Sequence, residues 1–138
     1  MHALHQLKAR YFRYWDGKEF DNWLSLFLED ATFEVVMALA STPEDAKPFK
    51  VQGKQSFRET IIAMNADTRT VHRGHTPEID LHSPGEASGI WAMDDIVERR
   101  HMTIYGHGYY HERYQKLHGE WSIASVRLTR NRYTTICR

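Results

Sequence analysis

Two histidines, His72 and His75, lie three residues apart in the stretch RTVHRGHTPEID, residues 69–80. The β-branched residues of this stretch predict a strand, and side chains that alternate along a strand place an odd spacing on opposite faces. His75 shares its parity with Arg73, the residue of this stretch that is least expected to be buried. We therefore expect His72 to face inward and His75 to face outward, so that only one of them serves a site.

A pair of aspartates interrupts an apolar strand pattern in GIWAMDDIV, residues 89–97. Both parities of this run are apolar, so at least one of Asp94 and Asp95 is expected to be drawn inward. A buried carboxylate needs a raised pKa or a cationic partner, which is how proteins prepare acids and bases. The alternative is a strand that kinks at the aspartates and leaves both in solvent, and parity alone does not decide between the two.

Arg130 lies in the last predicted strand, on the parity that carries the stronger apolar run. That parity set is Ser122, Ala124, Val126, Leu128, Arg130 and Arg132. A guanidinium on an inward face needs a carboxylate or a bound anion. The alternative is an arginine that extends along the rim of the sheet to water, which is the commoner arrangement near a chain end.

Tyr11 and Asp16 lie five residues apart near the end of the first predicted helix. Tyr11 belongs to the apolar stripe of that helix, which is typical of a core aromatic whose hydroxyl finds a partner. Asp16 precedes Gly17, and helix C-termini disfavour negative charge, so another group is expected to hold it there. The alternative is an ordinary aspartate at a helix end.

Nine histidines raise the question of a metal. His107 and His111, in IYGHGYYHERY, are four residues apart on a predicted strand, which separates them by about 13 Å and is too far for one ion. The sequence has no GxSxG motif, no glycine-rich phosphate loop and no cysteine nucleophile in context. We therefore expect no metal, no cofactor and neither covalent nor nucleotide chemistry.

These residues can act together only if the elements that carry them bring them to one place. Apolar residues three and four apart predict a first helix over residues 2–15 and a second over 21–27, followed by a strand over 31–37. The second helix is indicated by Phe20, Trp23, Leu24, Phe27 and Leu28. The segment 41–49, STPEDAKPF, predicts a loop before a third helix that begins near Ser56. The buried side of that helix is expected to carry Phe57, Ile61, Ile62 and Met64.

The second half of the chain predicts four strands, over residues 69–81, 87–99, 103–117 and 120–133. Strands of this length exceed the usual five or six residues, so we expect a strongly curved sheet with bent strands. Helices followed by an antiparallel meander indicate an α+β fold in which helices cover one face of the sheet.

The composition fits a single domain over residues 1–138. The 18 basic and 18 acidic residues cancel without forming a basic cluster, which excludes nucleic acid as a partner. Cys137 is the one cysteine, which excludes an internal disulfide and indicates a reducing, cytoplasmic compartment. Charged residues interrupt the N-terminal segment MHALHQLKARYFRYW, so we expect neither a signal peptide nor a membrane span.

Four segments resemble the SnoaL-like branch of the nuclear transport factor 2-like superfamily. They are LHQLKARYFRYWDGKEFDNWLSLFLEDATFE, TVHRGHTPEIDL, ASGIWAMDDIV and YHERYQKLHGEWSIASVRLTRNR, which together span nearly the whole chain. Within that branch the chain is most similar to the bile acid 7α-dehydratases and more distantly to the scytalone dehydratases.

The resemblance implies a cone: a curved, mostly antiparallel sheet wrapped around three N-terminal helices, with a deep pocket in its open end. It also implies a homodimer or homotrimer formed through the outer face of the sheet. The active-site pattern of the bile acid dehydratases, carried over motif by motif, falls on Tyr11, Asp16, His72, Asp95 and Arg130. Strand parity and this pattern select the same histidine.

Such a set of residues suits the elimination of water from a hydroxylated ketone or enone such as a steroid or polyketide. Neutral His72 would remove an acidic C–H proton and return it to the departing hydroxyl. Asp16 or Asp95 would orient the imidazole ring, and Tyr11 would donate a hydrogen bond to an enolate-like oxygen. Arg130 would pair with an aspartate and fix its position.

Three functions remain open at this point. The first is a cofactor-independent dehydratase, a carbon-oxygen lyase, acting on a small apolar hydroxylated carbonyl compound. The second is an isomerase or cyclase that uses the same base on a similar substrate, and the third is a non-catalytic cone that binds a small molecule. A pocket in which His72 contacts a carboxylate favours the first two, whereas a pocket plugged by Trp or Phe favours the third.

Overall fold

A computed structural model describes residues 2–37 and 48–138 of the chain. Its helical part comprises α1 (His2–Asp16), α2 (Phe20–Leu24), α3 (Lys54–Phe57), a π-helical turn over Arg58–Ile62 and α4 (Ala63–Asn65). Its strands are β1 (Phe27–Met37), β2 (Phe49–Gln52), β3 (Arg69–Ser83), β4 (Glu86–Glu98), β5 (Met102–Leu117) and β6 (Glu120–Cys137). The predicted loop over residues 41–49 lies mostly outside the described residues.

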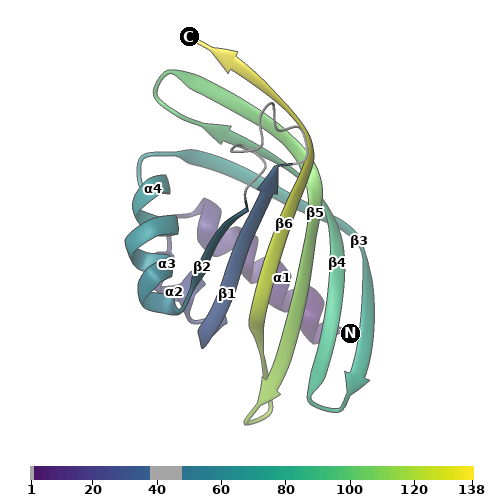
Figure 1. The fold of residues 1–138 in the computed structure, drawn as a ribbon. Helices are drawn as coiled ribbons and strands as arrows, with labels where there is room; N and C mark the ends of the chain where they lie inside the picture. The colour runs from purple at the N-terminus through teal and green to yellow at the C-terminus, as the bar shows by residue number, and fades with distance from the viewer. Residues whose placement is uncertain (1, 38–47) are drawn as a thin grey trace.

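The described strands form one curved sheet in the order β2-β1-β6-β5-β4-β3. The long helix α1 lies against its concave side, and α2, α3 and α4 gather beside the edge formed by β1 and β2 (Figure 1). All neighbouring strands pair antiparallel except β1 and β6, which run parallel. The predicted α+β fold, with a curved and mostly antiparallel sheet around N-terminal helices, is confirmed.

The first strand begins earlier than its sequence predicts. The backbone N–H of Ile123 donates to the carbonyl of Leu26 at 2.8 Å, so pairing with β6 draws the chain into the sheet from Phe27 onward. The predicted helix over residues 21–27 was therefore too long, since α2 ends at Leu24. Strand β2 was not predicted at all. Met64, expected on the buried side of the third helix, is 58 % exposed.

Two bulges in β6 change the face on which its side chains lie. The register with β5 shifts beside Ala124 and again beside Asn131, and each extra residue reverses the alternation. Ile123 is consequently fully buried, where the parity pattern had placed Ala124 inward. After the second bulge Arg132 is exposed rather than inward. The expectation of bent strands is confirmed, but a single parity could not hold along the whole of β6.

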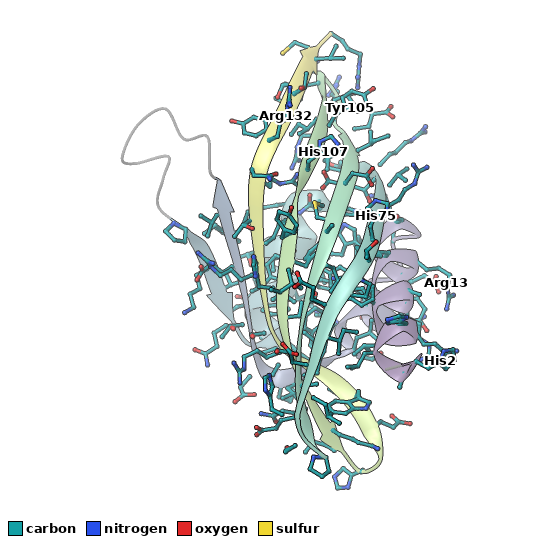
Figure 2. All side chains as sticks on the ribbon, turned by 90° about the vertical axis from the view of Figure 1, so that its right-hand side faces the viewer. His2, Arg13, His75, Tyr105, His107 and Arg132 are labelled. Carbon is teal, nitrogen blue, oxygen red and sulfur yellow. The ribbon has the colours of Figure 1, made fainter. Side chains whose placement is uncertain are left out.

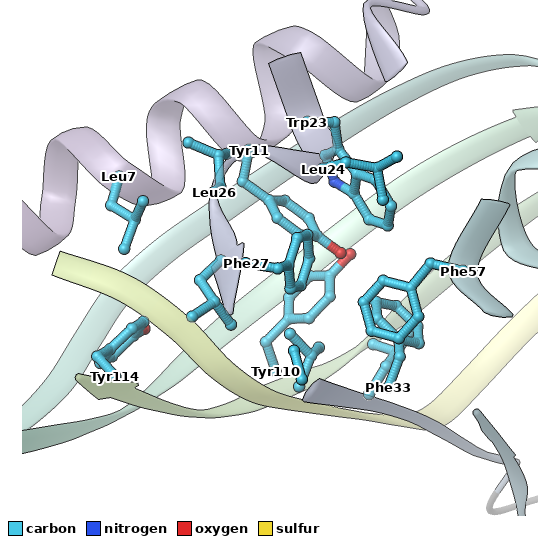
Figure 3. Packing of buried hydrophobic residues seen from close by; sticks show 14 of the residues in the cluster. Leu7, Tyr11, Trp23, Leu24, Leu26, Phe27, Phe33, Phe57, Tyr110 and Tyr114 are labelled. Atoms are coloured by element: carbon cyan, nitrogen blue, oxygen red, sulfur yellow. The ribbon is translucent and has the colours of Figure 1, made fainter. Parts of the chain in front are cut away.

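Aromatic side chains fill the space between α1 and the sheet. Trp23 is 1 % exposed, and its ring centroid lies 4.7 Å from that of Phe27 and 5.7 Å from that of Tyr11. Figure 3 shows Phe57 and Phe33 continuing this cluster toward the edge of the sheet. Among residues 2–37 and 48–138, no helix is long and apolar enough to cross a membrane.

Candidate active site

Asp16, the last residue of α1, is joined to β3 by three hydrogen bonds. Its carboxylate accepts from the backbone N–H of His72 at 2.9 Å and from the hydroxyl of Thr70 at 2.8 Å. It also lies 2.7 Å from Nδ1 of the His72 ring. Because an ionised carboxylate can only accept, Nδ1 is the donor in this contact, and in a neutral ring the lone pair would lie on Nε2. These donors hold the negative charge of Asp16 at a helix end that disfavours it.

A second carboxylate lies on the other side of the imidazole. Asp95 has a fully buried side chain, and its Oδ2 lies 3.5 Å from Nε2 of His72. Arg130 binds both oxygens of Asp95, with N–O distances of 2.9 and 2.5 Å. The structure thus brings Asp16, His72, Asp95 and Arg130 into one chain of contacts, drawn from α1, β3, β4 and β6.

Asp95 also fixes the charge of Arg130. Burial alone would lower the pKa of this guanidinium, but the hydrogen bonds and negative charge of Asp95 outweigh burial and raise the pKa. Gly106 makes the pair possible, because a Cβ at this position would overlap Nη1 of Arg130 and Oδ1 of Asp95. The inward position of Asp95 settles the choice between a buried and a solvated carboxylate, and Asp94 remains partly exposed.

Two tyrosines form a hydrogen-bonded pair beside this chain of contacts. Tyr11 of α1 and Tyr110 of β5 are 4 % and 2 % exposed, and their hydroxyl groups meet (Figure 3). Burial raises the pKa of both phenols well above the usual value, so both retain their protons and can donate. Tyr110 was not identified from the sequence. The alternation of GHGYYHERY, with Glu112 and Tyr114 on the same face, carried the signal.

These groups open onto an apolar cavity of about 450 Å³. Its lining includes His72, Arg130 and both tyrosines, and most of the remaining wall is hydrophobic. That wall includes Trp15, Trp23, Phe33, Val35, Ile61, Val97, Ile104 and Leu128. The aromatic side chains therefore line the cavity without filling it. Arg99 and Asn65 add polar groups to the lining, and neither was identified from the sequence.

His75 lies away from the cavity. Its ring is half-exposed and approaches Asp94 at 3.3 Å on the outer face of the sheet, where Figure 2 also shows His107 and Arg132. Strand alternation therefore separates the two histidines as predicted. Within the described part of the chain, no three His, Cys, Asp or Glu side chains are placed to hold a metal ion.

Comparisons of the sequence and of the structure both find similar proteins. The candidate cyclase FGR4 of Gibberella zeae is 27 % identical over 135 residues, which cover 89 % of this chain and 85 % of that protein. A candidate scytalone dehydratase from Novosphingobium aromaticivorans superposes with a TM-score of 0.78 at 23 % identity, covering 97 % of this chain and 85 % of the other. The hexachlorocyclohexane dehydrochlorinase LinA-type3 from Novosphingobium barchaimii gives a TM-score of 0.75 at 15 % identity, with coverages of 98 % and 88 %.

The family comparison covers almost the entire sequence. The model of the SnoaL-like domain matches residues 1–127, from the start of the chain into β6. This match includes α1, β3 and β4, and therefore Tyr11, Asp16, His72 and Asp95, and it ends three residues before Arg130. The chain belongs to the family of SnoaL-like domain proteins.

Proposed function

We propose that this protein is a cofactor-independent lyase that removes water from a small hydroxylated ketone or enone. The observation that carries the proposal is the contact between Asp16 and His72 at the wall of an apolar cavity. With Nδ1 protonated and bound by Asp16, the imidazole of His72 would use the lone pair of Nε2 as the base. Most of the cavity wall is apolar, which suits a substrate such as a steroid or a polyketide.

The reaction begins with the transfer of a proton from carbon to Nε2 of His72. The proton comes from a carbon adjacent to the carbonyl group, or conjugated with it, because there the electrons of the broken C–H bond move onto the carbonyl oxygen. As charge develops on that oxygen, the hydroxyl of Tyr11 gives up its hydrogen bond to Tyr110, and both hydroxyl groups donate to the oxygen instead. Asp16 and Asp95 stabilise the imidazolium that forms between them.

The second half of the reaction uses the same proton. As the enolate electrons form the new carbon–carbon double bond, the bond to the hydroxyl group breaks, and the imidazolium protonates the departing oxygen. The products are water and a conjugated carbonyl compound, and His72 returns to its neutral form. Arg130 takes no part in the proton transfer and fixes the position of Asp95 through two hydrogen bonds.

An isomerase or cyclase is the second candidate, because either would use the same base without losing water. The 27 % identity with the candidate cyclase FGR4 supports this second candidate. The candidate scytalone dehydratase and the dehydrochlorinase, whose names describe eliminations, favour the lyase. A non-catalytic binding cone is less well supported, since the cavity is open and His72 contacts a carboxylate.

A substrate panel tests the proposal. Hydroxy-enone steroids and polyketide-type hydroxy ketones are incubated with the protein, and the absorbance of the conjugated product is followed while mass spectrometry records the loss of water. Replacing His72 with alanine is expected to lower kcat by at least about 100-fold, whereas the exposed His75→Ala variant keeps its activity. Full turnover by His72→Ala would refute the proposed base, and a product of unchanged mass would identify an isomerase or cyclase.

A further inference from the structure

Next to the tyrosine pair lies a buried ion pair that takes no part in the reaction described above. Nζ of Lys8, on α1, lies 2.6 Å from Oε2 of Glu112, on β5, and their side chains are 1 % and 0 % exposed. The other oxygen of Glu112 accepts a hydrogen bond from the hydroxyl of Tyr114 at 2.6 Å, and that hydroxyl accepts from the indole of Trp91 at 2.9 Å. Glu112 is therefore held from both sides.

The ammonium group of Lys8 lies directly over the faces of both cavity tyrosines. Nζ is 3.7 Å from the ring centroid of Tyr11 and 3.6 Å from that of Tyr110. Two contacts of this kind by one buried cation place its charge against both phenols, where it opposes the charge of Glu112, which adds to burial in raising the pKa of Tyr11 and Tyr110. In the low-dielectric interior the attraction between a cation and an aromatic face is stronger than at the surface.

Stability alone gives little reason for this arrangement. Burying a lysine and a glutamate costs hydration, and replacing such a pair with apolar residues is often neutral or stabilising. The rings of Tyr11, Phe12 and Tyr110 lie around the ammonium group, so apolar contacts are available at this position without a charge. The placement of the charge, rather than the energy of the pair, is therefore the feature that needs an explanation.

We propose that Lys8, fixed by Glu112, is a positioning residue that strengthens the hydrogen bonds which Tyr11 and Tyr110 donate to the developing enolate oxygen. A positive charge against the face of a phenol ring draws electron density from the oxygen into the ring, so the O–H group becomes a better donor as negative charge builds up opposite it. The inference rests on the proposed function, in which the two hydroxyl groups bind that oxygen.

Titration of Lys8 offers a direct readout. Burial lowers its pKa from 10.5 to about 8, although the charge and hydrogen bond of Glu112 act in the opposite direction. The titratable groups around it are Glu112, Tyr110 and Tyr114 on β5, and Tyr11 on its own helix. Burial raises the pKa of the three tyrosines, so they keep their protons where Lys8 loses its own. The ammonium is present below about pH 8 and lost above it.

The test uses the double variant Lys8→Met/Glu112→Gln. Removing both charges together avoids leaving an unpaired carboxylate in the interior, which would itself destabilise the fold. We expect kcat to fall by about tenfold with a smaller change in KM, and the decline in kcat above about pH 8 to disappear. The matched control is Arg58→Met/Asp21→Asn, which removes an exposed ion pair of 2.8 Å and should leave kcat and its pH profile unchanged.

A second measurement needs no turnover. The absorbance of 4-nitrophenolate reports its binding, and its charged oxygen is a stand-in for the enolate. We expect it to bind the double variant about tenfold more weakly than the unmodified protein, and to bind the unmodified protein more weakly as the pH rises through 8. This pH titration applies even if the double variant does not fold. If 4-nitrophenolate bound both proteins with the same affinity, and bound the unmodified protein equally well below and above pH 8, the proposed role of Lys8 would be refuted.

The two hypotheses fail in different ways. Suppose that no member of the panel loses water, but 4-nitrophenolate binds more weakly to the double variant and at high pH, as expected. The dehydratase proposal is then wrong, and the effect of Lys8 on the tyrosines stands. If water is eliminated but both kcat and phenolate binding are the same in the double variant, the dehydratase stands and Lys8 is only a structural residue.

Discussion

Asp16 contacts His72 through both of its carboxylate oxygens, one at 2.7 Å from the ring nitrogen Nδ1 and the other at 2.9 Å from the backbone N–H. The backbone bond ties the end of α1 to β3, and the ring bond sets the orientation of the imidazole. A single carboxylate thus holds both the backbone and the ring of His72, and it favours the tautomer that carries the proton on Nδ1.

Replacing Asp16 with asparagine tests this second role. An amide can donate to Nδ1, which would leave the proton on Nε2 and remove the base from the face where it is needed. We expect kcat to fall by about 100-fold or more, with a smaller change in KM, as measured in the steady state on the substrate that the panel identifies. Thr70→Val, which removes only one donor to Asp16, should have a much smaller effect. Equal activity in Asp16→Asn would mean that the tautomer is set elsewhere.

Tyr110 is expected to matter as much as Tyr11. In the proposed reaction, removing either hydroxyl would deprive the enolate oxygen of a donor, and it would also remove the hydrogen bond from Tyr11 to Tyr110 that holds the two phenols together. We therefore expect Tyr110→Phe and Tyr11→Phe each to lower kcat by about 10- to 100-fold. In the variant that carries both substitutions, the fold-loss in kcat should be smaller than the product of the two single losses. The control is Tyr105→Phe, because this side chain is 40 % exposed, is labelled in Figure 2 and does not line the cavity. Strictly multiplicative losses would show that the two hydroxyl groups act independently.

Gly106 is expected to resist substitution by alanine. The added methyl group would collide with the paired side chains of Asp95 and Arg130, both of which are held by neighbouring elements. We expect Gly106→Ala to lower the free energy of unfolding by about 1–3 kcal/mol and to lower kcat, because His72 loses its fixed neighbour. Urea denaturation measures the first effect. Gly85→Ala is the comparison, since the nearest atom to its new Cβ would lie 3.8 Å away; equal stability of the two variants would contradict the prediction.

The ion pair between Asp95 and Arg130 predicts a specific order of stabilities. Arg130→Met leaves a fully buried carboxylate without its cation, so the free energy of unfolding should fall by about 3–5 kcal/mol. In Asp95→Asn/Arg130→Met no charge is stranded, and part of that loss should be recovered. Chemical denaturation of the three proteins at neutral pH provides the measurement. A double variant less stable than Arg130→Met would mean that Asp95 is stabilised by other groups.

Period-two alternation predicted which histidine of β3 faces inward, because that strand is regular near His72, but in β4 it left open whether either aspartate is buried. His72 and Asp95 are directly paired across the two strands, and both face α1, while His75 faces outward. The same rule failed in β6, where extra residues at Ala124 and Asn131 reverse the alternation twice. Such bulges depend on how β6 fits against β5, and a local pattern carries no sign of them.

The errors near the start of the sheet have a related cause. Phe27 and Leu28 have helical spacing relative to Trp23 and Leu24, yet pairing with β6, almost a hundred residues away, makes them a strand. Contacts between distant segments therefore overrode local periodicity. The two tyrosine hydroxyls meet for the same reason: Tyr11 and Tyr110 come from elements whose approach is a property of the complete fold.

The contacts of Asp16 with His72 and of Asp95 with Arg130 join residues 56 and 35 positions apart. Together they connect the first helix to the last strand, so neither a growing chain nor a fragment that lacks β6 can assemble all four groups. Contacts of such long range slow folding, because a large loop must close before they form. The appearance of catalytic activity during refolding would therefore be a late event, and would report the fraction of molecules in which the whole sheet has closed around α1.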